Sequence, residues 1–72
     1  MDNVKIVRTR TGSFDIFVND AKRAEALTRE LTLFWLTKRR VPQRIASGRI
    51  DYAAEAGMET FKADLIKPVW EL

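Results

Sequence analysis

The first eighteen residues contain two short runs rich in β-branched and aromatic residues, VKIVR at 4–8 and SFDIFV at 13–18. Gly12 lies between them, so the pattern predicts a β-hairpin. A three-residue turn is favoured, because a G1 bulge requires left-handed backbone only at Gly12. A one-residue slip would send the aliphatic side chains to opposite faces of the sheet. The expected register pairs Val4 with Val18, Ile6 with Ile16 and Arg8 with Phe14.

After the hairpin, the apolar residues recur at helical spacing. Asn19 or Asp20 is a suitable N-cap for a helix. We expect this helix to continue to about Arg40, because Pro42 disfavours helical geometry in the residue before it. The apolar stripe that should cover the hairpin consists of Ala24, Leu27, Leu31, Phe34 and Trp35.

A connection and a second helix are expected in the next part of the chain. Residues 41–50 form the connection, with room for a short helical turn at 43–46 and a break at Ser47-Gly48. The second helix should run from Asp51 to about Ile66. Its apolar stripe consists of Ile50, Ala54, Met58, Phe61 and Leu65.

The C-terminal residues leave two interpretations open. Pro68 ends the second helix, and residues 69–72 alternate weakly between apolar and polar. They form either a short third strand beside the hairpin or an irregular tail whose Trp70 fills the core. The whole pattern predicts an α+β fold of order ββαα, in which an N-terminal hairpin packs on a long helix followed by a second helix. Residues 1–72 are expected to form a single small domain.

Composition narrows the classes of protein that this chain can belong to. It has no cysteine and no histidine, so disulfides are excluded and we expect no metal and no cofactor. The longest apolar run, residues 33–36, is far too short to span a bilayer, so no membrane association is expected. The first residues lack the apolar core of a signal peptide, which favours a cytoplasmic location.

Basic charge is concentrated in one segment. Residues 38–49, KRRVPQRIASGR, hold five of the thirteen lysines and arginines and no acidic residue. Cations this close repel one another, so an anionic partner would stabilise them. Arginines also flank the expected hairpin turn. We predict one common positive surface made of Arg8, Arg10, Lys38, Arg39, Arg40, Arg44 and Arg49. Part of this charge also has structural explanations, at the end of a helix and at a strand edge.

Two leucines lie on the side of the first expected helix that faces away from its apolar stripe. Leu33 and Leu36 share this side with cations, which is unusual for a solvated surface. Three interpretations remain open: the second helix covers them, a second copy of the chain covers them, or they are the apolar contacts of a different partner. Burying both would stabilise the protein by roughly 3–6 kcal/mol, so we expect them to be covered.

Catalytic patterns are weak. The serine, threonine and tyrosine hydroxyls have no histidine or cysteine to activate them. Glu55 and Glu59 are four residues apart, but with Lys62 nearby they indicate a solvated helix surface rather than an acid–base pair. The chain contains no glycine-rich phosphate loop. We therefore expect that it is not an enzyme.

The leading hypothesis is a small regulatory or inhibitory binding protein that docks through its basic surface onto a host protein or nucleoprotein complex. In size and composition the chain resembles the small accessory proteins of phages and other mobile elements. A direct DNA- or RNA-binding domain is one alternative. A homo-oligomeric assembly protein is another, because residues 1–49 carry a net charge of +6 and residues 50–72 carry −3.

Overall fold

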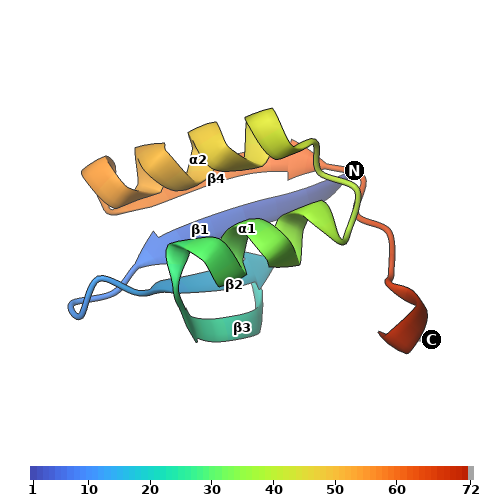
Figure 1. The fold of residues 1–72 in the computed structure, drawn as a ribbon, viewed down its shortest axis with the longest axis horizontal. Helices are drawn as coiled ribbons and strands as arrows, with labels where there is room; N and C mark the ends of the chain where they lie inside the picture. The colour runs from blue at the N-terminus through green and yellow to red at the C-terminus, as the bar shows by residue number, and fades with distance from the viewer. Residues whose placement is uncertain (72) are drawn as a thin grey trace.

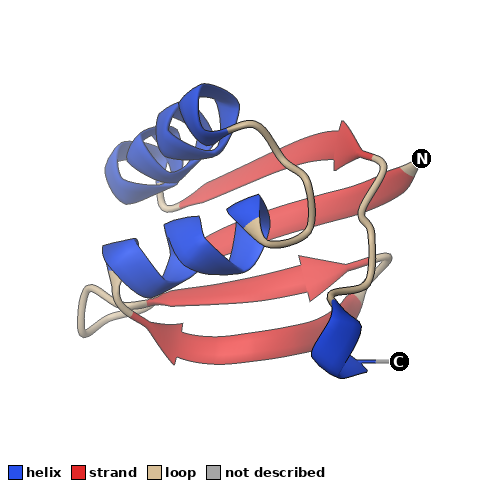
Figure 2. Cartoon of the chain, turned by 45° about the vertical axis from the view of Figure 1, so that its right-hand side comes forward, coloured by secondary structure: helices blue, strands red, loops and turns tan. Residues whose placement is uncertain are grey.

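The structure, a computed structural model, describes residues 1–71 and contains one four-stranded antiparallel sheet with two helices on one face (Figures 1 and 2). The strand order is β3-β2-β1-β4. Helix α1 packs against β2 and β3, and α2 packs against β1 and β4. The predicted α+β class is confirmed. The elements are β1 (Asp2–Arg8), β2 (Phe14–Val18), β3 (Ala21–Leu27), α1 (Arg29–Thr37), α2 (Gln43–Ala56), β4 (Met58–Ala63) and the short 3-10 helix η1 (Val69–Glu71).

The predicted hairpin is confirmed in its register. Strands β1 and β2 pair Val4 with Val18, Ile6 with Ile16 and Arg8 with Phe14. Gly12 has a φ of +84°, which is the left-handed backbone that the bulged turn requires. Its N–H donates to the Thr9 carbonyl over 3.1 Å, which closes the turn.

Residues 21–27 form a strand, so the prediction that they belong to the first helix is wrong. Asn19 and Asp20 have φ values of +50° and +70° and make a two-residue turn between β2 and β3. Asn and Asp tolerate this backbone, which is why such pairs make tight hairpins. The sequence AKRAEAL favours a helix by propensity, but pairing with β2 overrides that preference.

Helix α1 is shorter than predicted at both ends. Its N-cap is Thr28, whose hydroxyl accepts a hydrogen bond from the Leu31 N–H over 3.1 Å. At the other end, Val41 N–H donates to the Leu36 carbonyl and Arg40 N–H donates to the Thr37 carbonyl. This pair of bonds is a Schellman motif, which stops the helix before Pro42 can.

Helix α2 begins eight residues earlier than predicted and ends ten residues earlier. It runs through Ser47-Gly48, because Ala46, Ile50 and Ala53 recur at helical spacing and are all fully buried. The helix ends at Gly57, whose φ of +92° is left-handed. Residues 58–63 then form β4 beside β1, so the predicted helix over these residues is wrong.

The core lies between the helices and the inner face of the sheet. Its fully buried aliphatic side chains include Val4, Ile6 and Ile16 of the sheet and Leu36 of α1. The tail makes the turn η1 and does not join the sheet, while Leu72 lies outside the described residues. No helix in residues 1–71 is long and apolar enough to cross a membrane.

We predict that Gly48→Ala stabilises the protein by about 0.5–1 kcal/mol, because alanine loses less backbone entropy within a helix. Nothing lies within 4 Å of a Cβ built at Gly48, so the added methyl group meets open space. Chemical denaturation measures the change. Gly57→Ala is the matched control and should destabilise, because its space is equally open but its backbone is left-handed. Equal effects of the two changes would contradict the role assigned to each glycine.

Candidate partner-binding surface

The predicted basic residues do not form one surface. The hairpin turn that carries Arg10 lies at one end of the molecule, and the connection from α1 to α2 lies at the other end in both ribbon views (Figures 1 and 2). The longest dimension of the chain is 32 Å. The expected common positive surface of hairpin tip and post-helix arginines is therefore wrong, because the hairpin turn and the C-terminal end of α1 lie at opposite ends of the molecule.

Arg39 is part of the interior rather than of the surface. Only 5% of the residue is exposed. Its guanidinium stacks 3.7 Å from the centre of the Trp35 ring and donates to the Trp35 carbonyl over 3.0 Å. It also forms an ion pair with Glu71. Burial lowers the pKa of Arg39, and the neighbouring Glu71 carboxylate opposes that effect. Arg39 is thus unavailable to a partner that docks on the surface.

Arg8 and Arg49 also serve the fold. The Arg8 guanidinium donates to the Ala54 carbonyl in the last turn of α2, where a cation complements the helix dipole. Arg49 donates to Oε2 of Glu59 over 2.9 Å. Oε1 of Glu59 accepts the Thr60 backbone N–H over 2.9 Å. The Glu59 carboxylate therefore binds Arg49 and a backbone N–H of β4. It forms neither an acid–base pair with Glu55 nor an ion pair with Lys62 in the described residues.

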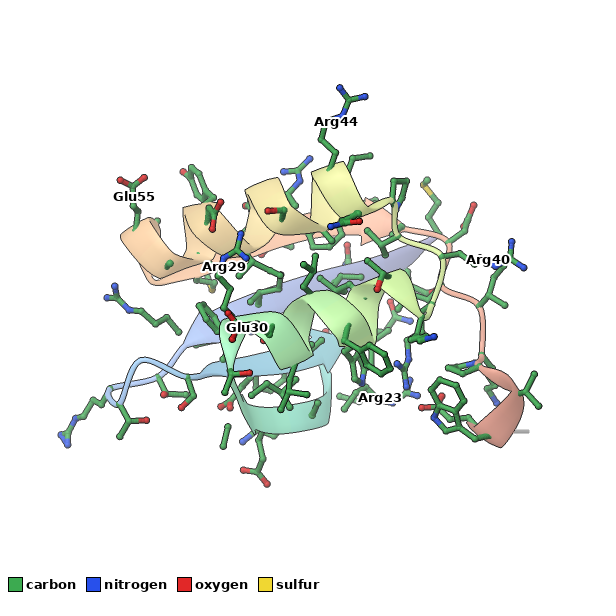
Figure 3. All side chains as sticks on the ribbon, in the orientation of Figure 1. Arg23, Arg29, Glu30, Arg40, Arg44 and Glu55 are labelled. Carbon is green, nitrogen blue, oxygen red and sulfur yellow. The ribbon has the colours of Figure 1, made fainter. Side chains whose placement is uncertain are left out.

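Three of the predicted cations near the connection from α1 to α2 are open to solvent: Lys38, Arg40 and Arg44. We call them the basic corner. They lie where α1 ends and α2 begins, and none of them has an ion pair within residues 1–71. Figure 3 shows Arg40 and Arg44 extending away from the body of the protein. No acidic side chain in the described part of the chain neutralises this corner.

An apolar groove runs beside the basic corner. One stripe of α1 forms one wall, and the residues just before and at the start of α2 form the other. The groove has a volume of about 490 Å³ and carries a single charged residue, Glu30, at the end remote from the basic corner. Its lining residues are Glu30, Leu33, Phe34, Thr37, Val41 and Gln43.

The two leucines singled out in the sequence have different positions. Leu36 is fully buried in the core, so it is not available for contact with a partner. Leu33 is half-buried and lines the groove. Leu31 and Phe34 are instead the exposed apolar residues of α1, at 52% and 50%. The predicted stripe was wrong because Ala24 and Leu27 belong to β3 and do not share a helix face with Leu31.

A polar clamp that the sequence did not reveal fixes the two helices against each other. Arg29 Nε donates to Oδ1 of Asp51 over 3.0 Å, and its Nη2 donates to the Ser47 hydroxyl over 2.7 Å. The Asp51 carboxylate raises the pKa of Arg29. The Thr28 N-cap was the available signal, because it places Arg29 in the first turn of α1. The clamp sets the relative position of the helices, and hence the width of the groove.

No protein-family model, curated protein or solved structure matches this chain. Within the described residues, no group of three or more acidic, histidine or cysteine side chains is placed to hold a metal ion. The functional interpretation of the basic corner and the groove therefore depends on the geometry of this structure alone.

We predict that Arg39→Ala destabilises the protein by about 2–3 kcal/mol, because it removes a charged hydrogen bond and strands a partly buried carboxylate. Arg44→Ala is the matched control and should change stability by less than about 0.5 kcal/mol, since Arg44 is exposed and makes no ion pair in residues 1–71. Thermal unfolding of both variants tests this division of the arginines. Equal losses would refute it.

Proposed function

We propose that the protein is a non-enzymatic regulatory or inhibitory binding protein that docks onto an acidic protein partner. The contact consists of the basic corner and the adjoining apolar groove. A complementary partner segment presents acidic side chains to Arg40 and Arg44 and an apolar side chain to the groove.

The backbone of Arg40 is the observation that carries this proposal. Arg40 occupies the position after α1 with a φ of +73°, where glycine is the favoured residue. A left-handed backbone costs a residue with a Cβ roughly 1–2 kcal/mol. An exposed arginine in so unfavourable a backbone conformation supports a role for its side chain in binding, because strained residues concentrate at functional sites.

The groove supplies the apolar part of the contact. Half of the Phe34 surface is exposed, and Lys38 Nζ lies 5.0 Å from the centre of its ring. An exposed aromatic ring with a polar neighbour resembles the centre of a binding hot spot, where an apolar anchor is surrounded by polar contacts. Covering the exposed half of Phe34 would contribute about 1 kcal/mol.

The position of the charges favours a protein partner over a nucleic acid. A nucleic-acid surface tracks a phosphate backbone with many aligned cations. Here the basic corner has three cations, Arg10 lies at the opposite end of the molecule, and Glu30 lies in the groove. A few exposed cations near an apolar groove are better suited to an acidic protein surface.

The decisive experiment is an affinity capture with the Arg40→Glu, Arg44→Glu double variant, made with and without nuclease. We expect the unchanged chain to retain a specific protein after nuclease treatment and the double variant to lose it. Phe34→Asp should lose the same protein, because it places a charge in the groove. Arg10→Glu is the matched control, since it reverses one equally exposed cation at the far end of the molecule, and should retain the protein.

Two results would overturn the proposal. Capture that disappears with nuclease would identify a nucleic acid as the ligand. Retention of the protein by the double variant would show that the basic corner is not the contact.

We also predict that Arg40→Gly makes the protein more stable and the complex weaker. Relief of the left-handed strain should stabilise the fold by about 1 kcal/mol, and loss of the guanidinium should weaken binding about tenfold. Thermal unfolding and a titration with the captured partner measure the two effects. Arg40→Ala separates them, because it removes the charge but keeps a Cβ at the strained position. A binding affinity unchanged in both variants would remove Arg40 from the contact.

A further inference from the structure

A second cavity lies beside the C-terminal segment, and several charged residues line it. A polar pocket of about 200 Å³ lies between the β2–β3 turn, the residue before the basic corner's Arg40, and residues 65–71. It is a separate cavity from the groove. Its charged lining residues are Asp2, Arg23, Arg39, Lys67 and Glu71.

Arg39 forms the floor of this pocket and is held rigidly. Trp35 packs against the face of its guanidinium at 3.7 Å, and the Trp35 carbonyl accepts its Nη1 over 3.0 Å. Its Nη2 donates to Oε2 of Glu71. A buried guanidinium requires an anion beside it, and here the anion comes from the chain itself.

Glu71 fills this site incompletely. Its Oε1 is buried and has no hydrogen-bond donor within residues 1–71. Arg23 Nη2 lies 3.6 Å from Oε1, which is within an ion pair but beyond a hydrogen bond. A buried oxygen without a donor costs free energy. The Glu71 carboxylate thus forms ion pairs with both guanidinium groups but a hydrogen bond only with Arg39.

The segment that carries Glu71 has little apolar anchorage at its end. Val69 and Trp70 are 84% and 65% exposed, so among residues 69–71 only Glu71 makes an ion pair with the body of the protein. Before them, Pro68 is buried and Ile66 N–H donates to the Arg39 carbonyl over 3.2 Å. Closer to β4, Leu65 N–H donates to the Asp2 carboxylate over 3.2 Å. Hydrogen bonds from Asn19 and Leu65 lower the pKa of Asp2. Movement of residues 69–71 alone would therefore open the pocket without breaking the Asp2 anchor.

We propose that Arg23 and Arg39 form a binding site for a phosphate group, and that Glu71 occupies this site as an internal substitute when no ligand is present. The ligand displaces the Glu71 carboxylate. This inference does not depend on the proposed function, because it concerns a different cavity and a different pair of arginines.

Phosphate suits the site better than a carboxylate for two reasons. Its additional oxygens can accept hydrogen bonds from Arg23 and Arg39 together, whereas Glu71 accepts one only from Arg39. Its greater negative charge also strengthens the attraction to Arg23, Arg39 and Lys67, which outnumber the single Asp2 carboxylate that lines the same pocket and repels an anion. Lys67, which also lines the pocket and precedes residues 69–71 in the chain, adds a third cation.

The test uses the Glu71→Gln variant, which keeps the shape of the side chain and removes its charge. Inorganic phosphate should raise its apparent Tm by about 4–8 °C, whereas acetate or chloride at equal ionic strength should not. Glu55→Gln is the matched control, because it removes an exposed carboxylate at the far end of α2, and should respond no more than the unchanged chain (Figure 3). A phosphoserine titration distinguishes a phosphate monoester from free phosphate as the ligand.

The Arg23→Gln, Glu71→Gln double variant decides whether the effect comes from this pocket. It should lose the phosphate response, since Arg23 is 41% exposed in its side chain and its removal leaves the core intact. An equal response to phosphate and acetate, or a response that survives in the double variant, would overturn the proposal.

An NMR titration of the unchanged chain avoids any variant that fails to fold. The Trp35 indole N–H should shift saturably with phosphate, at about tenfold higher concentration than in Glu71→Gln, because the ligand must displace the internal carboxylate. Absence of a saturable shift in the unchanged chain would equally refute the site.

Discussion

The pairing of β1 with strands on both of its sides is the constraint on which the rest of the structure depends. β1 pairs with β2 through a short hairpin and with β4 across more than fifty residues of sequence. Val4 and Ile6 are consequently fully buried beneath the helices. Because β4 returns to β1, α2 must lie across their inner faces, and α1 must cover β2 and β3. The groove and the pocket lined by Arg23 and Arg39 both lie where this arrangement brings distant segments together.

Local signals were sufficient where local backbone geometry decided the structure, and insufficient elsewhere. The hairpin register followed from Gly12 and the alternation of aliphatic residues, and it is confirmed. Residues 21–27 have the composition of a helix, and a strand forms there because Asn19 and Asp20 turn the chain back onto β2. Likewise, the apolar residues in 58–63 follow helical spacing, but the segment forms a strand because it pairs with the free edge of β1. Long-range pairing of this kind leaves little trace in a single sequence.

The same limit explains what could be predicted of the candidate sites. The excess of basic residues after α1 was visible, and three of them do form an open corner. The sequence could not show which of the other predicted cations are structural. Arg39, Arg8 and Arg49 contact their partners only because the tertiary fold brings them together. Arg23 and Glu71 were missed altogether, because they are separated by 48 positions and the first was assigned to a helix. The arginines thus divide into those that hold the fold together and those that remain free.

The hydrogen bond from the Thr60 N–H to the Glu59 carboxylate affects how two molecules of this protein can associate. β4 is an outer strand, and its unpaired amides are a natural template for a strand from a neighbouring chain. An incoming carbonyl would have to compete with a carboxylate that Arg49 already holds in place. Addition of a strand at the β4 edge is thereby disfavoured.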